Sequence, residues 1–392
     1  ELSAYDSLMV ARPAEWEAAI DERLLVVEIT EDDTDEYGYP IRDGTLALAL
    51  EKLQRYRPQT IGIDLHRYQP NEPGRDKLIE QFANSSNLVT VCMFDPKGRE
   101  ILGHPPEFSF EQASNQVGFS DLELDGDFDG GQDAVRRQLL SYDPHQSLDD
   151  SNCITPYSFS LNLALRFLTS QGIEPLTHDQ DHHWQLGKVI FERLASRAGG
   201  YQNLDGQSSQ ILLNYRFNPK PAQRISLGDV LKEEFDTTVV QNRIVLMGVT
   251  DEKIGNDYLN TPYGRLPGVW IHTHGNSQLL STEMDGRSPM WVLPQWHRLQ
   301  WGDSLWGWVW ALTGGLLAWQ IRSVWLLTLA GAIAVWGLYQ VCLLALIQGG
   351  WLPLVPALLT LVGTAGFLLI RKYTYLRLTF GDLLHRFARR RY

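Results

Sequence analysis

Two histidines separated by one residue are the first candidates for chemistry in this chain. They lie in PGVWIHTHGNSQLL, residues 267–280, as His272 and His274. Pro267 suits the first turn of a helix, and side chains two positions apart on a helix point about 200° away from each other, so they cannot share one ion. Helical metal-binding histidines are four positions apart, and the residue four after His272 is Asn276, a weak ligand. We expect a helix that packs against a sheet; a metal site is the less favoured alternative.

The acidic stretch DGDFDGGQD, residues 125–133, is a second candidate. Asp125, Asp127 and Asp129, followed by a glycine, match the first half of a calcium-binding loop, in which alternate side-chain oxygens coordinate the ion. The position of the bidentate glutamate is taken by Arg136, a cation. Half a loop predicts calcium only weakly, and a long turn between two strands explains the same residues.

Four further aspartates stand where apolar, strand-like runs end. Asp32 and Asp33 follow the first of these runs, Asp64 ends the second and Asp251 follows the last. The carboxyl ends of parallel strands form the ligand crevice of an open α/β sheet, so these side chains are our candidates for binding a cation or a cationic ligand. The alternative is that they cap the helices that follow.

The sequence contains no recognisable catalytic or cofactor-binding motif. It has no G-x-S-x-G, G-x-x-x-x-G-K, G-x-G-x-x-G or H-E-x-x-H pattern. Cys153 and His145 lie in a loop-like stretch whose composition does not predict a reactive thiol. We therefore expect neither an enzyme nor a bound cofactor. Cys92 lies in an apolar run, which favours a buried free thiol over a disulfide with Cys153, the other cysteine outside the apolar C-terminal region.

The elements that position these residues alternate between strands and helices. Apolar, β-branched runs predict strands, and apolar residues at helical spacing predict helices between them. The predicted strands are 23–30, 60–65, 87–94, 210–216 and 243–250, and the predicted helices include 44–56, 73–84 and 156–168. This order predicts an α/β fold with a mainly parallel sheet sandwiched by helices, in one domain with an insertion near 100–205.

Three uncharged stretches follow this domain. Residues 304–321, 324–347 and 351–370 are each close to the ~20 apolar residues that a helix needs to cross a bilayer, and tryptophans lie near their ends. We therefore expect three transmembrane helices. They divide the chain into an outer domain of residues 1–303, the three spans and a basic tail of residues 371–392.

The charge of the chain is distributed very unevenly. The net charge is −13, and the part after residue 303 holds eight Lys or Arg and one acid, which leaves residues 1–303 at −20. Such an acidic domain does not suit nucleic-acid binding. Basic residues favour the cytoplasmic side, so we expect the tail in the cytoplasm and residues 1–303 outside the inner membrane. The tail carries apolar residues at helical spacing, which suits lipid contact or coupling to another segment.

Several segments resemble the CHASE type-two extracellular sensor family. They are IGIDLHRYQP, GFSDLELDGD with VRRQLL, ILLNYR and the long stretch from Arg243 to Ser281. The resemblance covers essentially the whole chain and implies a bacterial signalling protein with three closing membrane helices. It also implies a further helix before Glu1 and a cytoplasmic effector; because the chain stops 22 residues after the last span, we expect this effector upstream, as a CHAT-like domain. The resemblance supplies no ligand.

These expectations describe a multi-pass membrane sensor. An unknown small ligand or ion changes the outer domain, and the membrane helices relay the change to the effector. Glycines in the membrane helices, such as Gly314 and Gly363, allow close packing and favour a homodimer. The alternative is a structural or anchoring subunit of a membrane assembly that binds no ligand.

Overall fold

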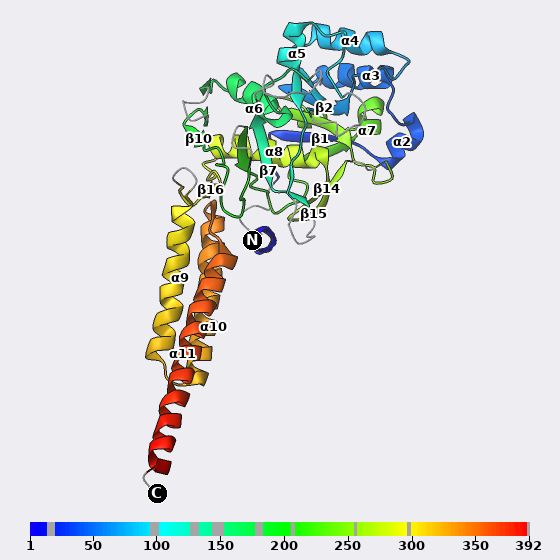
Figure 1. Ribbon diagram of the computed structural model, residues 1–392. Helices are drawn as coiled ribbons and strands as arrows, with labels where there is room; N and C mark the ends of the chain where they lie inside the picture. The colour runs from blue at the N-terminus through cyan, green and yellow to red at the C-terminus, as the bar shows by residue number, and fades with distance from the viewer. Residues whose placement is uncertain are drawn as a thin grey trace. The chain divides into compact units, whose positions relative to one another are not determined.

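The computed structural model describes most of the chain in two compact units (Figure 1). The described residues are 1–13, 20–94, 102–125, 133–142, 153–176, 183–204, 208–254, 257–295 and 299–389. One unit, the sheet unit, comprises residues 13–194 and 205–290. The other, the helical unit, comprises residues 1–12, 195–204 and 291–392.

The sheet unit is built on a parallel sheet of six strands in the order β12-β1-β13-β2-β3-β4. The α/β fold with a mainly parallel sheet is therefore confirmed. The predicted strands at 23–30, 60–65, 87–94 and 243–250 all belong to it, because fully buried strands are continuous apolar runs. The strands are β1 (Leu24–Ile29), β2 (Thr60–His66), β3 (Leu88–Cys92), β4 (Val117–Phe119), β12 (Gln223–Ser226) and β13 (Ile244–Val249).

Helices cover both faces of this sheet, as the alternation of strand side chains requires. In β1, Leu25 and Val27 join one core with the helices α3 to α5 and α7, while Leu24 and Val26 join a second core with α6 and α8. Figure 1 shows α3 and α4 on one side of the strands and α6 and α8 on the other. These helices are α3 (Asp43–Gln54), α4 (Arg75–Asn84), α5 (Phe110–Gln116), α6 (Phe159–Ser170), α7 (Leu227–Lys232) and α8 (Gly268–Met284).

The remaining elements of the sheet unit are short. The predicted strand 210–216 forms β11, which pairs antiparallel with β7 and lies outside the six-stranded sheet. The small strands are β5 (Leu124–Asp125), β6 (Ala134–Val135), β7 (Arg137–Ser141), β8 (Pro175–Leu176), β9 (Trp184–Leu186), β10 (Val189–Phe191), β11 (Ser209–Leu212), β14 (Tyr258–Thr261) and β15 (Gly264–Pro267). Helix α2 (Glu31–Tyr37) and the 3₁₀ helix η3 (Thr237–Val239) complete the unit.

Cys92 and Cys153 form a disulfide, so the expectation of a free thiol at Cys92 is wrong. The cause is an arrangement that is not visible locally in the sequence. Strand β4 lies beside β3, and the segment leading into α6 runs along β4, with the Phe119 amide donating to the Tyr157 carbonyl. Cys153 at the start of that segment is thereby brought to the end of β3. Disulfides are characteristic of oxidising compartments.

The helical unit contains α1 (Leu2–Val10), α9 (Trp301–Gln320), α10 (Val324–Ile347), α11 (Leu354–Arg389) and the short strands β16 (Trp291–Val292) and β17 (Gly350–Trp351). Among the described residues, two helices are long and apolar enough to cross a membrane: Val324–Ile347 and Leu354–Lys372. They coincide with two of the three predicted spans. The third, 304–321, is the helix α9, and its crossing of a membrane stays a prediction. The predicted tail continues the last helix to Arg389.

Candidate functional site

The carboxyl ends of β1, β13 and β2 lie at one edge of the sheet, which we call the carboxyl edge. The predicted aspartates are at this edge, but they divide into two groups. Asp33 and Asp251 lie among loop and helix backbone beyond the strands, whereas Asp64 is part of β2 and faces α8. Asp32 is exposed in the first turn of α2.

Asp33 and Asp251 hold loops together. Asp33 Oδ2 accepts a hydrogen bond of 2.8 Å from the Thr30 amide, and its Oδ1 accepts one of 2.7 Å from the Gly228 amide. Asp251 accepts a hydrogen bond of 2.7 Å from the Thr34 hydroxyl and one of 2.8 Å from the Lys253 amide. Burial opposes ionisation of Asp251, but these donors outweigh it and hold its pKa below the ordinary value. For Asp33 the geometry is that of a helix cap, the alternative considered from the sequence.

Asp64 lies on the face of the sheet that α8 covers. The strand register aligns Glu28 of β1, Gly248 of β13 and Asp64 of β2 in one row across the sheet. Gly248 is required here by close packing, because a Cβ atom on it would lie 2.6 Å from the Cβ of Val269 at the start of α8. The first turn of α8 therefore lies directly against this row.

Glu28 and Asp64 differ in how their charge is compensated. Glu28 receives the Lys220 ammonium at 2.8 Å, the Arg224 guanidinium at 3.3 Å and the Trp270 indole N–H at 3.0 Å. Among the described residues, Asp64 forms no ion pair. The uncompensated carboxyl of the row is thus Asp64.

Asp257 is a second carboxyl at this position, and the sequence reasoning did not single it out. The strands β14 and β15 pair Tyr258 with Pro267, which places Asp257 beside Gly268, the first residue of α8. A Cβ atom on Gly268 would lie 2.7 Å from both carboxylate oxygens of Asp257. Although Asp257 is an exposed residue, its carboxylate lies against the first turn of the helix. The hairpin, with glycine in its turn, is the sequence signal that could have indicated this proximity.

Asp64 and Asp257 are both costly to ionise, and the charge of Asp257 adds to the cost at Asp64. Burial raises the pKa of Asp64 well above its ordinary value, and the charge of Asp257 raises it further. Burial also raises the pKa of Asp257 to about 6, against the opposing effect of the Gly268 amide. Two carboxyls that share an uncompensated site favour a shared proton or a cation.

Two histidines, the half-buried His66 of β2 and the buried His272 of α8, are linked electrostatically in the same region. Burial lowers the pKa of both histidines to about 4. The positive charge of Arg67 lowers the pKa of His66 further, and the charge of His66 lowers that of His272. His272 Nδ1 lies 3.2 Å from the Ser160 hydroxyl, while His66 Nδ1 has no hydrogen-bond partner among the described residues. In the part of the chain that the structure describes, no three His, Cys, Asp or Glu side chains are grouped closely enough to hold a metal ion. The described residues of the site therefore offer two carboxyls for a proton or a cation, and no group of three metal ligands.

The two histidines of the opening motif serve packing. Both lie on α8, as expected, and both are buried. His272 packs edge-on against Phe159 at 5.3 Å between ring centres. His274 packs against Tyr215 at 4.9 Å, and its Nδ1 accepts a hydrogen bond from the Arg216 amide.

Of the three aspartates predicted to bind calcium, only the first, Asp125, lies among the described residues. Asp125 is buried and accepts a hydrogen bond of 2.8 Å from the Arg137 Nε, and Arg136 donates to the Asp125 carbonyl at 2.9 Å. Asp127 and Asp129 lie outside the described residues. The carboxylate of Asp125 is therefore neutralised by Arg137.

Comparison with known proteins adds one finding to this geometry. The family model of the CHASE2 domain matches residues 1–316, which include the sheet, the carboxyl edge and most of α9. No curated protein and no solved structure matches the chain.

Proposed function

Because this chain belongs to the CHASE2 domain family, an extracellular sensor family, we propose that it is the sensing part of a multi-pass receptor in the inner membrane. The observation that carries the proposal is that the matched domain is continuous in sequence with apolar helices. The family match extends to residue 316, and the two apolar helices at Val324–Ile347 and Leu354–Lys372 follow almost at once. A sensor fused in this way to membrane helices can pass on a change in its own conformation.

The orientation that we propose places the acidic residues outside the cell membrane. Arg322 and the basic residues after Ile370 then lie in the cytoplasm, and α9 is the first of three spans. The Cys92–Cys153 disulfide supports this placement, since disulfides persist in oxidising compartments. The effector is a cytoplasmic domain, which we expect to be CHAT-like, and the receptor works as a homodimer.

The proposed stimulus is a proton, a cation or a cationic ligand at Asp64 and Asp257. Such a ligand removes the repulsion between the two carboxyls and so favours the state in which α8 lies tightly on Gly248. A ligand shifts a conformational equilibrium only by its difference in affinity for the two states. Asp64 and Asp257 supply such a difference in affinity if the distance between their carboxyls changes with the position of α8.

The test is a thermal melt of the full chain in lipid nanodiscs against a series of metal cations and polyamines. We expect one of them to raise the melting temperature by several degrees, and the double change Asp64→Asn with Asp257→Asn to abolish the rise. A chain that responds to none of them, and co-purifies in fixed ratio with other membrane subunits, favours the structural alternative.

A further inference from the structure

A polar pocket lies at the amino ends of the strands, at the edge of the sheet opposite the carboxyl pair. It has a volume of about 470 Å³, within the range of small-molecule sites. Gln59 and Asn87 precede β2 and β3, Asn115 lies just before β4, and Asn162, Arg166 and Thr169 come from α6. Apart from Arg166, the polar side chains lining the pocket are neutral amides and hydroxyls.

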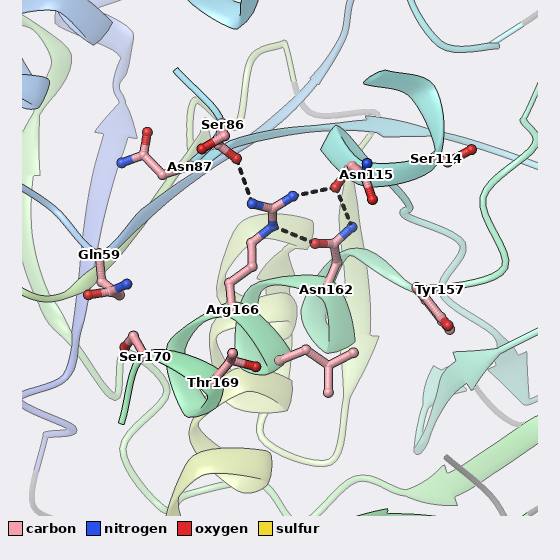
Figure 2. Close-up of a pocket in the computed structure, with 11 residues that line it drawn as sticks. Gln59, Ser86, Asn87, Ser114, Asn115, Tyr157, Asn162, Arg166, Thr169 and Ser170 are labelled. Atoms are coloured by element: carbon pink, nitrogen blue, oxygen red, sulfur yellow. Dashed lines mark hydrogen bonds between the residues drawn. The ribbon is translucent and has the colours of Figure 1, made fainter. Parts of the chain in front are cut away.

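Arg166 is the one cation among the lining residues. Figure 2 shows its side chain rising from α6 into the middle of the labelled residues. Its Nε donates to Asn162 Oδ1 at 2.8 Å, its Nη1 to the Ser86 carbonyl at 2.6 Å and its Nη2 to the Asn115 carbonyl. These bonds hold the guanidinium in place and account for three of its five N–H donors.

The charge of Arg166 is not matched by a carboxylate. All three acceptors are neutral oxygens, and among the described residues no acid forms an ion pair with it. Burial lowers its pKa, and no acidic neighbour acts against this. The Asn115 carbonyl, in the last turn of α5, offsets part of the charge through the helix dipole. A partly buried cation without a counter-ion, inside a polar pocket, is a site for an anion.

We propose that this pocket binds a small organic carboxylate that carries hydroxyl groups. The carboxylate accepts from the two remaining N–H groups of Arg166, because guanidinium and carboxylate match in geometry. The hydroxyls exchange hydrogen bonds with the side-chain amide of Gln59, which both donates and accepts. The inference goes beyond the proposed stimulus at the carboxyl edge, because it concerns a different ligand at the opposite edge of the sheet.

The test is calorimetric titration of the full chain in nanodiscs with gluconate, with acetate and with sorbitol. We expect gluconate to bind more tightly than acetate, and sorbitol, which has hydroxyls but no charge, not to bind. No binding of either carboxylate, or equal binding of sorbitol, overturns the proposal.

Variants of the chain test whether gluconate binds at Arg166. Thr169 is exposed at the pocket, so Thr169→Asp adds a negative charge without removing a contact of Arg166. Because this charge repels the carboxylate, we expect the affinity for gluconate to fall about tenfold. Gln241→Glu, at an exposed position outside the pocket lining, adds the same charge elsewhere and is expected to bind as the unchanged chain does. Equal affinities of these two variants contradict the site.

Arg166→Gln is the direct variant, expected to abolish binding, with its melting temperature recorded to detect unfolding. The cation response of Asp64 and Asp257 is measured separately, so either proposal can fail alone. A chain that binds gluconate without any cation response supports this pocket only.

Discussion

At the scale of single residues, the carboxyl pair is where burial and like charge act in the same direction. Asp64 and Asp257 both have a raised pKa, whereas the pKa of Asp251 at the same edge is lowered by its hydrogen-bond donors. The difference is one of partners: Asp251 accepts from Thr34 and Lys253, while no ion pair compensates Asp64 among the described residues. Opposite pKa shifts predict opposite responses of stability to pH.

The pair therefore destabilises the fold as pH rises. A raised folded-state pKa means that the native state keeps its proton between the ordinary value near 4 and about 6, so stability falls across that window and stays lower above it. We expect Asp257→Asn to stabilise the chain at pH 8 by about 1 kcal/mol, a value discounted for its exposure, and to change little at pH 4. Thermal unfolding at the two pH values measures this.

Asp251→Asn is the matched control for that measurement. Its pKa is lowered, so its stabilisation is present above the ordinary value and lost as pH falls through the folded pKa. The variant should melt lower than the unchanged chain at pH 8, and the difference should shrink in acid. If both variants shift stability in the same direction at pH 8, the electrostatic account of this edge is wrong.

Gly248 sets how closely α8 approaches the sheet. The added methyl of Gly248→Ala would lie 2.6 Å from the Val269 Cβ and 3.3 Å from the Asp64 Cβ, and both of these are held by packed backbone. We expect a loss of about 1–3 kcal/mol, the usual cost of overpacking. Gly331→Ala, with no atom within 4 Å of the new methyl, is the control and should not lower the melting temperature.

At the scale of elements, strands with a local apolar run could be predicted from the sequence. Features that depend on pairing with distant segments could not. The runs at 23–30, 60–65 and 243–250 became strands of the sheet because buried parallel strands need unbroken apolar sequence. The short β4 and β12 carry no comparable run, and their places beside β3 and β1 depend on distant partners. Asp257 and the Cys153 partner were missed for the same reason: a hairpin and a strand-like segment bring them to the site.

The disulfide crosses 61 residues of chain between β3 and the segment before α6. Loop-closure entropy over that separation predicts a stabilisation of about 4 kcal/mol. Thiol titration of the unfolded, unreduced chain should find one reactive cysteine, Cys342, and Cys92→Ser with Cys153→Ser should melt much lower than Cys342→Ser. Three reactive thiols in freshly prepared, unreduced protein would show that the bridge is absent.

Helices α9 and α11 pack through small residues. The Thr360 hydroxyl donates to the Gly307 carbonyl at 3.1 Å, the Thr364 hydroxyl donates to the Ala311 carbonyl at 3.0 Å, and a side chain at Gly314 would overlap the Leu361 carbonyl. Such contacts stabilise helix pairs in lipid. We expect Gly314→Leu to separate the helices and lower the melting temperature in nanodiscs. Gly331→Leu, into open space, should not, and equal effects of the two changes would exclude this packing.

At the scale of the whole molecule, the chain joins an acidic part to apolar helices and a basic tail. Residues 1–303 carry −20 and the rest carries +7. The family match makes the acidic part a sensor domain, and the positive-inside rule predicts the side of the membrane on which it lies. The proposed sensing of external ligands favours the same orientation as the disulfide, which is characteristic of oxidising compartments.

Substituted-cysteine labelling in intact cells tests this orientation most directly. Gln241→Cys and Thr379→Cys are made separately in a Cys342→Ser background, in which the disulfide leaves no other free thiol. A membrane-impermeant maleimide should label position 241 at once and position 379 only after the cells are permeabilised. Labelling of position 379 in intact cells, with position 241 protected, would place the acidic domain in the cytoplasm and contradict the receptor.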